Sequence, residues 1–477
     1  MPLHIYNSLN KQKELFQPIT PNIVKMYVCG MTVYDYCHIG HARVIVVFDV
    51  VAKWLRTSGF DVIYVRNITD IDDKIIDRAV KNRESISNLT TRFIQAMHED
   101  ADALGAARPD FEPKATEYLQ PMLSMIGKLF ANDLAYQSAS GDVNFKVRSF
   151  LNYGKLSGKN IDDLQSGHRE NANINNNNAN YKQDPLDFVL WKAAKEHEPQ
   201  EVKWQSPWGT GRPGWHIECS AMSCSILGEQ FDIHGGGMDL QFPHHENEIA
   251  QSEGANNYQN GEYIHKNVAN YWIHNGFVKI NDEKMSKSLD NFFTVREVFE
   301  HFHPEVVRFF ILKAHYRSPL NYADIYLKEA KLGLERIYNC LEKYDNIHIN
   351  ANDNNLDWQN EYAICFKKAL DDDFNTAIAI SVLFEMVHTL NKEHNPYLAK
   401  LLKHLCSILG FGQLLNSDAL SLNHQLNTEL VEQKINERKT AKLEKRYKDA
   451  DKIREDLISM GIILQDKLNG ETTWKKS

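Results

Sequence analysis

Two histidines separated by an isoleucine and a glycine, His38-Ile39-Gly40-His41, form the first group of residues with evident chemistry. Both imidazoles can donate hydrogen bonds to phosphate oxygens, and Gly40 allows a nucleotide to pack against the backbone. The start of a helix suits phosphate, because its free N–H groups and its dipole favour an anion. This segment, here called the first signature, predicts a triphosphate site.

A second group, Lys284-Met285-Ser286-Lys287-Ser288, lies much further along the chain. Two lysines and two hydroxyls on a short polar loop suit a mobile clamp on pyrophosphate. Charge builds on that leaving group during attack at the α-phosphorus, so cations there stabilise the transition state selectively. We call this segment the second signature. Alone it could be a solvated surface loop, but together the two signatures predict catalysis by His38, His41, Lys284 and Lys287.

The pair of signatures resembles the nucleotide-binding signatures of class I aminoacyl-tRNA synthetases. Further segments, which together extend the likeness to nearly the whole chain, resemble the cysteinyl-tRNA synthetase family. These segments are 27–35, 67–74, 214–222, 234–240 and 242–248. The resemblance implies an enzyme that activates L-cysteine with ATP and Mg²⁺ and transfers it to tRNA(Cys).

Four residues form a plausible zinc set of two thiolates, one imidazole and one carboxylate. They are Cys29, Cys219, His244 and Glu248. His244 and Glu248 are four residues apart, a spacing that places them on one helical face. His245 is also within reach of Glu248, so spacing alone does not choose between the histidines; the family pattern favours His244.

Zinc would have a purpose beyond structure, since a hydrophobic pocket separates such similar substrates as cysteine and serine by only about 1–3 kcal/mol. The metal prefers a thiolate and promotes its deprotonation near neutral pH. Selection at the first step would make proofreading unnecessary, and the span between the signatures leaves no room for a large editing domain. A purely structural zinc would need the same ligands, so the pattern leaves direct coordination of the substrate open.

The resemblance assigns further contacts. Thr69 and Trp215 are candidates for the amino-acid pocket. ATP contacts are expected from His38, Gly40, His41, Gly236, Asp239 and Lys287, and tRNA contacts from Arg438, Lys442, Asp451 and Asp466. An acidic group, Asp70, Asp72 and Asp73, could suggest magnesium, but helix capping and salt bridging are the favoured interpretation.

The elements that position these residues follow from hydrophobic periodicity. The β-branched and aromatic segments 23–29 and 61–66 predict strands, and apolar residues three and four apart between 44 and 55 predict a helix between them. This βαβ unit predicts a doubly wound parallel, Rossmann-like sheet. Further along, apolar residues at helical spacing, among them Ile337 and Leu341, predict a bundle whose apolar stripe is core.

The expected domains are a class I catalytic domain, a helical bundle that binds tRNA, and a small mixed α/β unit for the anticodon. Their ranges are 1–315, 316–418 and 425–477. Within the first, the Rossmann halves cover about 20–110 and 205–290, a connective insertion covers about 115–204, and the segment with the second signature covers about 281–315. The polar tract 171–180 predicts a mobile loop, and the run 433–448 a basic helix.

Bulk composition is that of a globular protein, with 43% hydrophobic and 25% charged residues. A net charge of −9 argues against a general nucleic-acid coating protein. Seven scattered cysteines indicate a reducing compartment, and the absence of a signal or a membrane-spanning stretch indicates a cytoplasmic protein; the family implies a monomer. Two alternatives remain: a cysteine ligase acting on an amino sugar, and a non-catalytic zinc-dependent RNA-binding protein.

Overall fold

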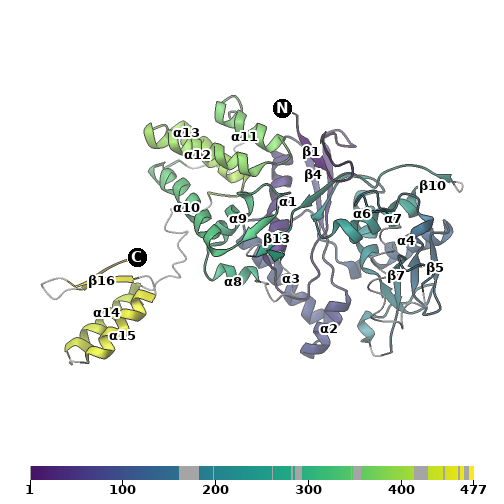
Figure 1. The fold of residues 1–477 in the computed structure, drawn as a ribbon, viewed down its shortest axis with the longest axis horizontal. Helices are drawn as coiled ribbons and strands as arrows, with labels where there is room; N and C mark the ends of the chain where they lie inside the picture. The colour runs from purple at the N-terminus through teal and green to yellow at the C-terminus, as the bar shows by residue number, and fades with distance from the viewer. Residues whose placement is uncertain are drawn as a thin grey trace. The chain divides into compact units, whose positions relative to one another are not determined.

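The structure is a computed structural model. It describes residues 2–160, 182–196, 198–259, 262–280, 283–284, 293–344, 346–347, 356–412, 428–443, 446–459, 462–466 and 472–476. The chain forms two compact units, residues 1–420 and 421–477. Figure 1 shows the elements of both.

Four parallel strands form the central sheet of the first unit, in the order β12-β9-β3-β4. They are β3 (Ile23–Val28), β4 (Asp61–Arg66), β9 (Phe231–Gly237) and β12 (Ala269–Asn275). The chain leaves β3 toward β4 but later enters on the other side at β9, so the strand order reverses between β3 and β9. Helix α1 (Ile39–Thr57) lies on one side of the sheet, and α6 (Trp215–Leu227) and α7 (Glu246–Asn256) lie on the other (Figure 1). The expected doubly wound parallel fold is confirmed, and such folds bind ligands at the reversal point.

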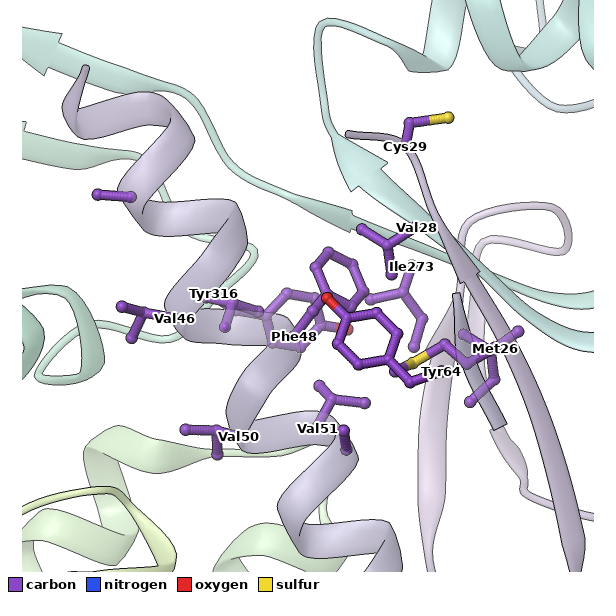
Figure 2. Close-up of a cluster of buried hydrophobic side chains, with 14 of the residues drawn as sticks. Met26, Val28, Cys29, Val46, Phe48, Val50, Val51, Tyr64, Ile273 and Tyr316 are labelled. Carbon is purple, nitrogen blue, oxygen red and sulfur yellow. The ribbon is translucent and has the colours of Figure 1, made fainter. Parts of the chain in front are cut away.

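Helix α1 is held to the sheet by its buried apolar stripe. Val46, Phe48, Val50 and Val51 are all buried; Phe48 and Val51 face the strands in the core cluster of Figure 2, and Val46 and Val50 lie on the opposite face of the helix. The helix starts earlier than its apolar pattern indicated, because the first signature itself forms its first turn. A Cβ added at Gly235 would lie 2.3 Å from the Phe48 ring, so the helix approaches β9 as closely as a glycine allows.

The connective insertion contains an antiparallel sheet in the order β5-β6-β7-β8. Its strands are β5 (Ala135–Gln137), β6 (Val143–Phe145), β7 (Phe188–Ala193) and β8 (Gly211–Pro213). The last strand falls a few residues beyond the expected end of the insertion. Helix α4 (Leu119–Ala131) packs between this sheet and α6 and α7. The expected mobile loop 171–180 lies outside the described residues.

The second Rossmann half continues into a small three-stranded sheet, in the order β14-β13-β15. Its strands are β13 (Val278–Ile280), β14 (Glu283–Lys284) and β15 (Leu320–Tyr322). The backbone of Lys284 pairs with Lys279, whereas the rest of the second signature, Lys287 included, lies outside the described residues.

Helices follow in the part predicted to be a bundle, α10 (Asp324–Leu341), α11 (Glu361–Asp371), α12 (Thr376–Lys392) and α13 (Pro396–Ile408). The stripe that includes Ile337 and Leu341 is buried, as expected of a bundle core. The bundle is tied to α1 by Trp54, whose Nε1 donates to Asp371 at 3.2 Å.

The remaining elements of the first unit are short or peripheral. They are β1 (His4–Asn7), β2 (Gln12–Leu15), α2 (Asp73–Asn82), α3 (Ile86–Ala103), β10 (Tyr258–Gln259), β11 (Glu262–Tyr263), α8 (Val295–Phe299) and α9 (Pro304–Leu312). Among the described residues, no helix is long and apolar enough to span a bilayer.

The second unit consists of α14 (Thr428–Leu443) and α15 (Tyr447–Ser459), followed by the antiparallel strands β16 (Ile462–Asp466) and β17 (Thr472–Lys476). The mixed α/β character is as expected. The basic run 433–448, expected as one helix, is divided between two helices.

Candidate active site

A cavity of about 370 Å³ opens at the carboxyl ends of the parallel strands, where the strand order reverses. Residues from both Rossmann halves line it, among them Cys29, His38, Gly40, His41, Trp215 and Asp239. Many of the residues expected to contact ATP or the amino acid therefore line the same cavity, although some of them are more than two hundred positions apart in the sequence. Arg66, Lys74 and Asn275 also line it, and sequence reasoning had given none of them a role there.

The two histidines of the first signature cap the helix that carries them. The His41 backbone N–H donates to Nδ1 of His38 at 3.2 Å, and the His38 backbone N–H donates to Nδ1 of His41 at 3.3 Å. The rings stack with centroids 3.6 Å apart. Because each Nδ1 accepts a hydrogen bond, a neutral ring carries its proton on Nε2, which makes Nε2 a donor suited to phosphate oxygens.

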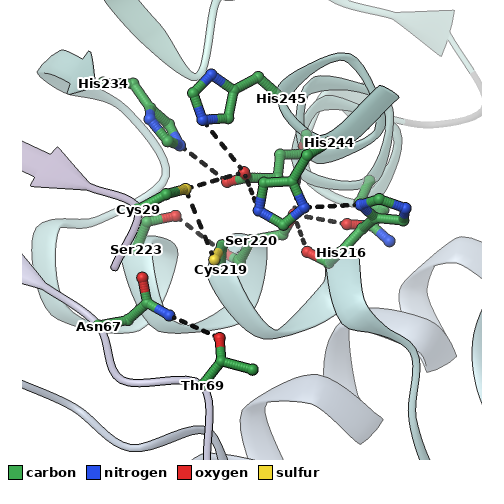
Figure 3. A network of polar contacts seen from close by, with 12 residues as sticks. Cys29, Asn67, Thr69, His216, Cys219, Ser220, Ser223, His234, His244 and His245 are labelled. Atoms are coloured by element: carbon green, nitrogen blue, oxygen red, sulfur yellow. Dashed lines mark hydrogen bonds and ion pairs between the residues drawn. The ribbon is translucent and has the colours of Figure 1, made fainter. Parts of the chain in front are cut away.

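The four residues expected to bind zinc meet at one end of the cavity, although they come from β3, α6, the turn before α7, and α7. Their ligand atoms all lie within 4.8 Å of one another, and all four residues are buried. Cys29 Sγ lies 3.7 Å from Cys219 Sγ and 3.3 Å from Glu248 Oε1, and His244 Nε2 lies 3.0 Å from the same oxygen. Figure 3 shows this convergence.

His244 contacts Glu248 across the expected spacing of four residues, with 3.0 Å between Nε2 and Oε1. It lies in a π-helical turn, Gln241–His245, that precedes α7. In this turn Nε2 of His244 is closer to Glu248 Oε1 than Nε2 of His245 is, since the His245 atom lies 4.0 Å away. A second possible ligand set nevertheless exists, in which His234 and His245 replace Cys219 and His244.

Electrostatics favour an anion at Glu248 and Cys219, whereas burial, together with Cys219 and Glu248, raises the pKa of the Cys29 thiol well above its usual value. Burial would raise the pKa of Glu248, but His234 and His244 hold that pKa well below its usual value. The hydrogen bond with Cys29 lowers the pKa of Cys219 to about 6 despite burial. Burial would lower the pKa of His244, yet Glu248 and Cys219 raise it to about 10. A carboxylate, a thiolate and an imidazolium thus share the cluster, and a metal cation could take the place of the ring proton.

Further histidines, without a role in the sequence-based site, surround the ligands. His216 Nδ1 contacts His244 Nδ1 at 2.8 Å, and His234 Nε2 contacts Glu248 Oε2 at 2.8 Å. His274 joins His245 to Ser8, the residue that follows β1, through two contacts of 2.8 Å. Such partners orient ligands. A sequence signal existed for two of them, since His216 and His234 lie within segments that carry the resemblance.

Comparisons with known proteins bear on this site. Residues 15–332 match the class I (C) tRNA synthetase catalytic domain, and residues 365–413 match the DALR domain. A cysteine–tRNA ligase of Cupriavidus pinatubonensis is 56% identical and covers 100% of this chain and 99% of its own. One of Dechloromonas aromatica is 57% identical, with both chains covered completely. The chain belongs to the cysteine–tRNA ligase family of class I synthetases.

Solved structures show the same fold at low identity. A Mycobacterium tuberculosis methionyl-tRNA synthetase in complex with methionyl-adenylate superposes with a TM-score of 0.56 at 12% identity, covering 81% of this chain and 89% of its own. An Agrobacterium radiobacter leucyl-tRNA synthetase in a ternary complex gives 0.53 at 12% identity, covering 86% and 88%. The expected class I fold is thereby confirmed.

The two amino-acid pocket candidates of this family member differ in position. Trp215 is 40% exposed, lines the cavity and stacks on the ring of His244 at 4.3 Å. Thr69 is buried below the cluster, where its Oγ1 accepts from Asn67 Nδ2 at 3.3 Å (Figure 3). Trp215 is therefore placed to contact a ligand directly, whereas Thr69 is not among the residues that line the cavity.

Of the expected ribose contacts, Asp239 is exposed at the cavity. A Cβ at Gly236 would lie 2.9 Å from the His245 ring, so this glycine makes room for the histidine beside the ligand cluster.

In the acidic group 70–73, Asp72 caps a helix and Asp73 forms salt bridges, in agreement with the interpretation favoured over a magnesium site. Asp72 accepts from the Lys74 backbone N–H at 2.9 Å and caps α2. Asp73 pairs with Lys192 and Arg212.

The residues expected to contact tRNA lie in the second unit. Arg438 is 4% exposed and Lys442 and Asp451 are exposed. The side chains of Asp466 and Lys284 lie outside the described residues.

Proposed function

We propose that this chain activates L-cysteine with ATP to form cysteinyl-adenylate and transfers the cysteinyl group to tRNA(Cys). The observation that carries the proposal is the position of the ligand cluster. Cys29 and Trp215 belong to the cavity that also holds His38 and His41, so a small thiol amino acid beside the cluster would lie within reach of a nucleotide bound at the first signature.

The residues of the cluster fit zinc in number and type. Two sulfur atoms, a ring nitrogen and a carboxylate oxygen are the donors that this metal prefers. A tetrahedral ion needs ligands a few ångströms apart, as the four atoms are. When bound there by Cys29, Cys219, His244 and Glu248, zinc would bind the thiolate of cysteine in preference to the hydroxyl of serine.

The chain's other residues have the task of positioning and neutralising charge. The helix start at 39 and the Nε2 atoms of His38 and His41 would bind the triphosphate of MgATP. Lys284 and Lys287 would stabilise the charge that develops on pyrophosphate while the substrate carboxylate attacks the α-phosphorus in line. Asp239 would hold the ribose. The adenylate is then attacked by the 2′-hydroxyl of the tRNA terminal ribose, and no protein nucleophile is needed.

The bundle and the second unit would hold the tRNA. A small acceptor such as an amino sugar would require neither of them, so their presence favours tRNA as the acceptor. The scattered free cysteines support a reducing, cytoplasmic site of action.

Cysteine-dependent exchange of pyrophosphate into ATP, followed by charging of tRNA(Cys), tests the proposal. We expect both activities, and a large loss of exchange in Lys287→Ala with an unchanged fold. Exchange without charging, but with ligation to an amino sugar, would favour the sugar ligase. Absence of exchange in zinc-loaded protein that still binds RNA would favour the non-catalytic alternative.

A further inference from the structure

Arg43 lies on α1, two residues after His41 of the first signature, and its side chain is 0% exposed. A buried guanidinium is expensive unless a carboxylate compensates its charge. Within the described part of the chain, no carboxylate lies within ion-pair distance of Arg43. Burial alone lowers its pKa to about 10, which leaves the side chain charged at neutral pH.

Backbone carbonyl groups take the place of a counter-ion. Nη1 donates to the carbonyl oxygens of Gly276 at 2.8 Å and Phe277 at 3.1 Å. Nη2 donates to those of His315 at 3.3 Å, Tyr316 at 2.9 Å and Ser318 at 2.5 Å. One planar group thus bonds to two chain segments at once, which the compact ammonium of a lysine cannot do with the same geometry.

Both segments lead directly into the small sheet that carries the second signature. Gly276 and Phe277 precede β13, and the segment 315–318 precedes β15, the parallel neighbour of β13. On its other edge β13 pairs with β14, which ends at Lys284, the first residue of the second signature. Arg43 therefore connects the helix of the first signature to the base of the sheet from which the second signature continues.

The two segments have little room to shift against each other. The Gly276 backbone N–H donates to Tyr316 O at 2.8 Å, and the Leu320 backbone N–H donates to Phe277 O at 2.9 Å. A Cβ at Gly276 would lie 2.5 Å from Ser318 O. Gly276 and Phe277 also line the cavity together with His41, so any displacement of this junction moves β13, and with it the backbone of Lys284 on β14, relative to His41.

We propose that Arg43 is a positioning residue that fixes the sheet bearing the second signature in register with the first signature. The inference rests on the proposed adenylate chemistry. Because a misplacement of about 1 Å can cost about a hundredfold in rate, Arg43 acts on the transition state through the lysines of the second signature. The ligand cluster around Cys29 and Cys219 has no bond to Arg43 among the described residues, so cysteine binding is independent of it.

The test uses the full-length, zinc-loaded protein and the variants Arg43→Lys and Arg43→Met in the pyrophosphate exchange assay. We expect Arg43→Lys to lower kcat about tenfold or more, with zinc content unchanged and KM for cysteine within about twofold of wild type. In combination with Lys287→Ala the losses should be smaller than the product of the single losses, because the lysine is already misplaced.

Arg308→Lys is the matched control. Arg308 is also fully buried and joins α9 to α1 through Asp49, but it makes none of the contacts to the β13 and β15 segments. It should lower Tm and leave kcat near wild type. Three outcomes would each overturn the inference. They are a wild-type kcat in Arg43→Lys, a double variant with Lys287→Ala whose loss equals the product of the single losses, and a kcat loss in Arg308→Lys equal to that in Arg43→Lys. A wild-type protein without exchange would instead contradict the proposed function. If Arg43→Met does not fold, Arg43→Lys decides alone.

Discussion

At the scale of single residues, the ligand cluster combines groups that are unfavourable when buried separately. Cys29, Cys219 and Glu248 would each be costly as anions in an apolar interior. Their mutual hydrogen bonds and the neighbouring imidazole of His244 offset that cost. A metal ion would offset it more completely, and the cluster is expected to depend on each ligand.

Replacing Cys219 by serine should abolish stable zinc binding, because a hydroxyl is a much poorer zinc ligand than a thiolate. Metal analysis of the purified variant should show a fall from about one ion per chain to nearly none. Cysteine-dependent exchange should fall with it.

Cys224→Ser is the control for that change. Cys224 lies on the same helix, α6, but belongs to neither possible ligand set, and its Sγ accepts from Asn256 Nδ2 at 3.8 Å. It should retain both zinc and exchange. Full zinc content in Cys219→Ser would remove Cys219 from the ligand set.

Sequence reasoning reached the ligands but not all of their geometry. The types of Cys29, Cys219 and Glu248, together with the family resemblance, were sufficient to bring them together. The choice between His244 and His245 needed a resemblance, since it depends on a π-helical turn that spacing rules do not describe. Arg43 had a signal that was not used: a charged residue inside the apolar stripe of a buried helix.

At the scale of elements, the site depends on how closely α1 approaches the sheet. Gly235 on β9 permits this approach, because its missing side chain leaves room for the ring of Phe48. The helix start and the ends of β3 and β9 then form one cavity.

Gly235→Ala should lower the free energy of unfolding by about 1–3 kcal/mol, since the added methyl group overpacks the contact with Phe48. Urea denaturation followed by circular dichroism measures the change. Adding Phe48→Leu to Gly235→Ala should restore part of the loss.

Gly127→Ala serves as the comparison. Gly127 is exposed on α4, and an added Cβ meets nothing within 4 Å. This variant should be neutral or more stable by up to about 1 kcal/mol, because alanine favours helix. An equal loss in both variants would show that packing against Phe48 is not the cause.

The periodic elements were predictable, and the irregular ones were not. The strands near 23–29 and 61–66 and the helix between them follow from local apolar patterns. The division of the basic run between α14 and α15 escaped prediction, because the run of basic residues continues across the break and the residues between Leu443 and Tyr447 include no glycine or proline.

At the scale of the whole molecule, a buried ion pair joins the catalytic fold to its later helices. Asp49 on α1 accepts from Arg308 on α9 at 2.5 Å, from Lys53 at 2.8 Å and from the Ala107 backbone N–H at 2.9 Å. Arg308 also donates to Leu409 O at 2.7 Å, beyond α13.

Asp49→Asn should lower the free energy of unfolding at pH 7 by about 3–5 kcal/mol, because it leaves Arg308 buried without its partner. Burial would raise the pKa of Asp49, but Arg308 and Lys53 hold that pKa below its usual value. The stabilisation is thus complete above about pH 4 and is lost as the pH falls through the lowered pKa.

The difference in stability between wild type and Asp49→Asn should therefore shrink on acidification below about pH 4, as measured by urea denaturation at several pH values. A difference that stays constant at all pH values would contradict this account. Glu329→Gln, which removes an exposed pair with Lys313, should change stability by less than about 1 kcal/mol.

The division into two compact units predicts separable steps. A chain that ends at residue 420 should fold, bind zinc and catalyse pyrophosphate exchange at a rate near wild type. Its kcat/KM for tRNA(Cys) should fall about tenfold or more, since the second unit no longer contributes binding. Loss of exchange in a folded, zinc-containing truncation would show instead that the second unit supports adenylate formation.

The ligand cluster also has a consequence for how the chain acquires its shape. Cys29 and Cys219 are 190 residues apart in sequence, so an ion held by both closes a very long loop. Closing such a loop removes conformational freedom from the unfolded chain, and metal affinity then becomes part of the folding free energy. During synthesis the ion cannot be enclosed until Glu248 has left the ribosome, so the ability to choose an amino acid arises only after β9, the first strand of the second half of the sheet, has been made.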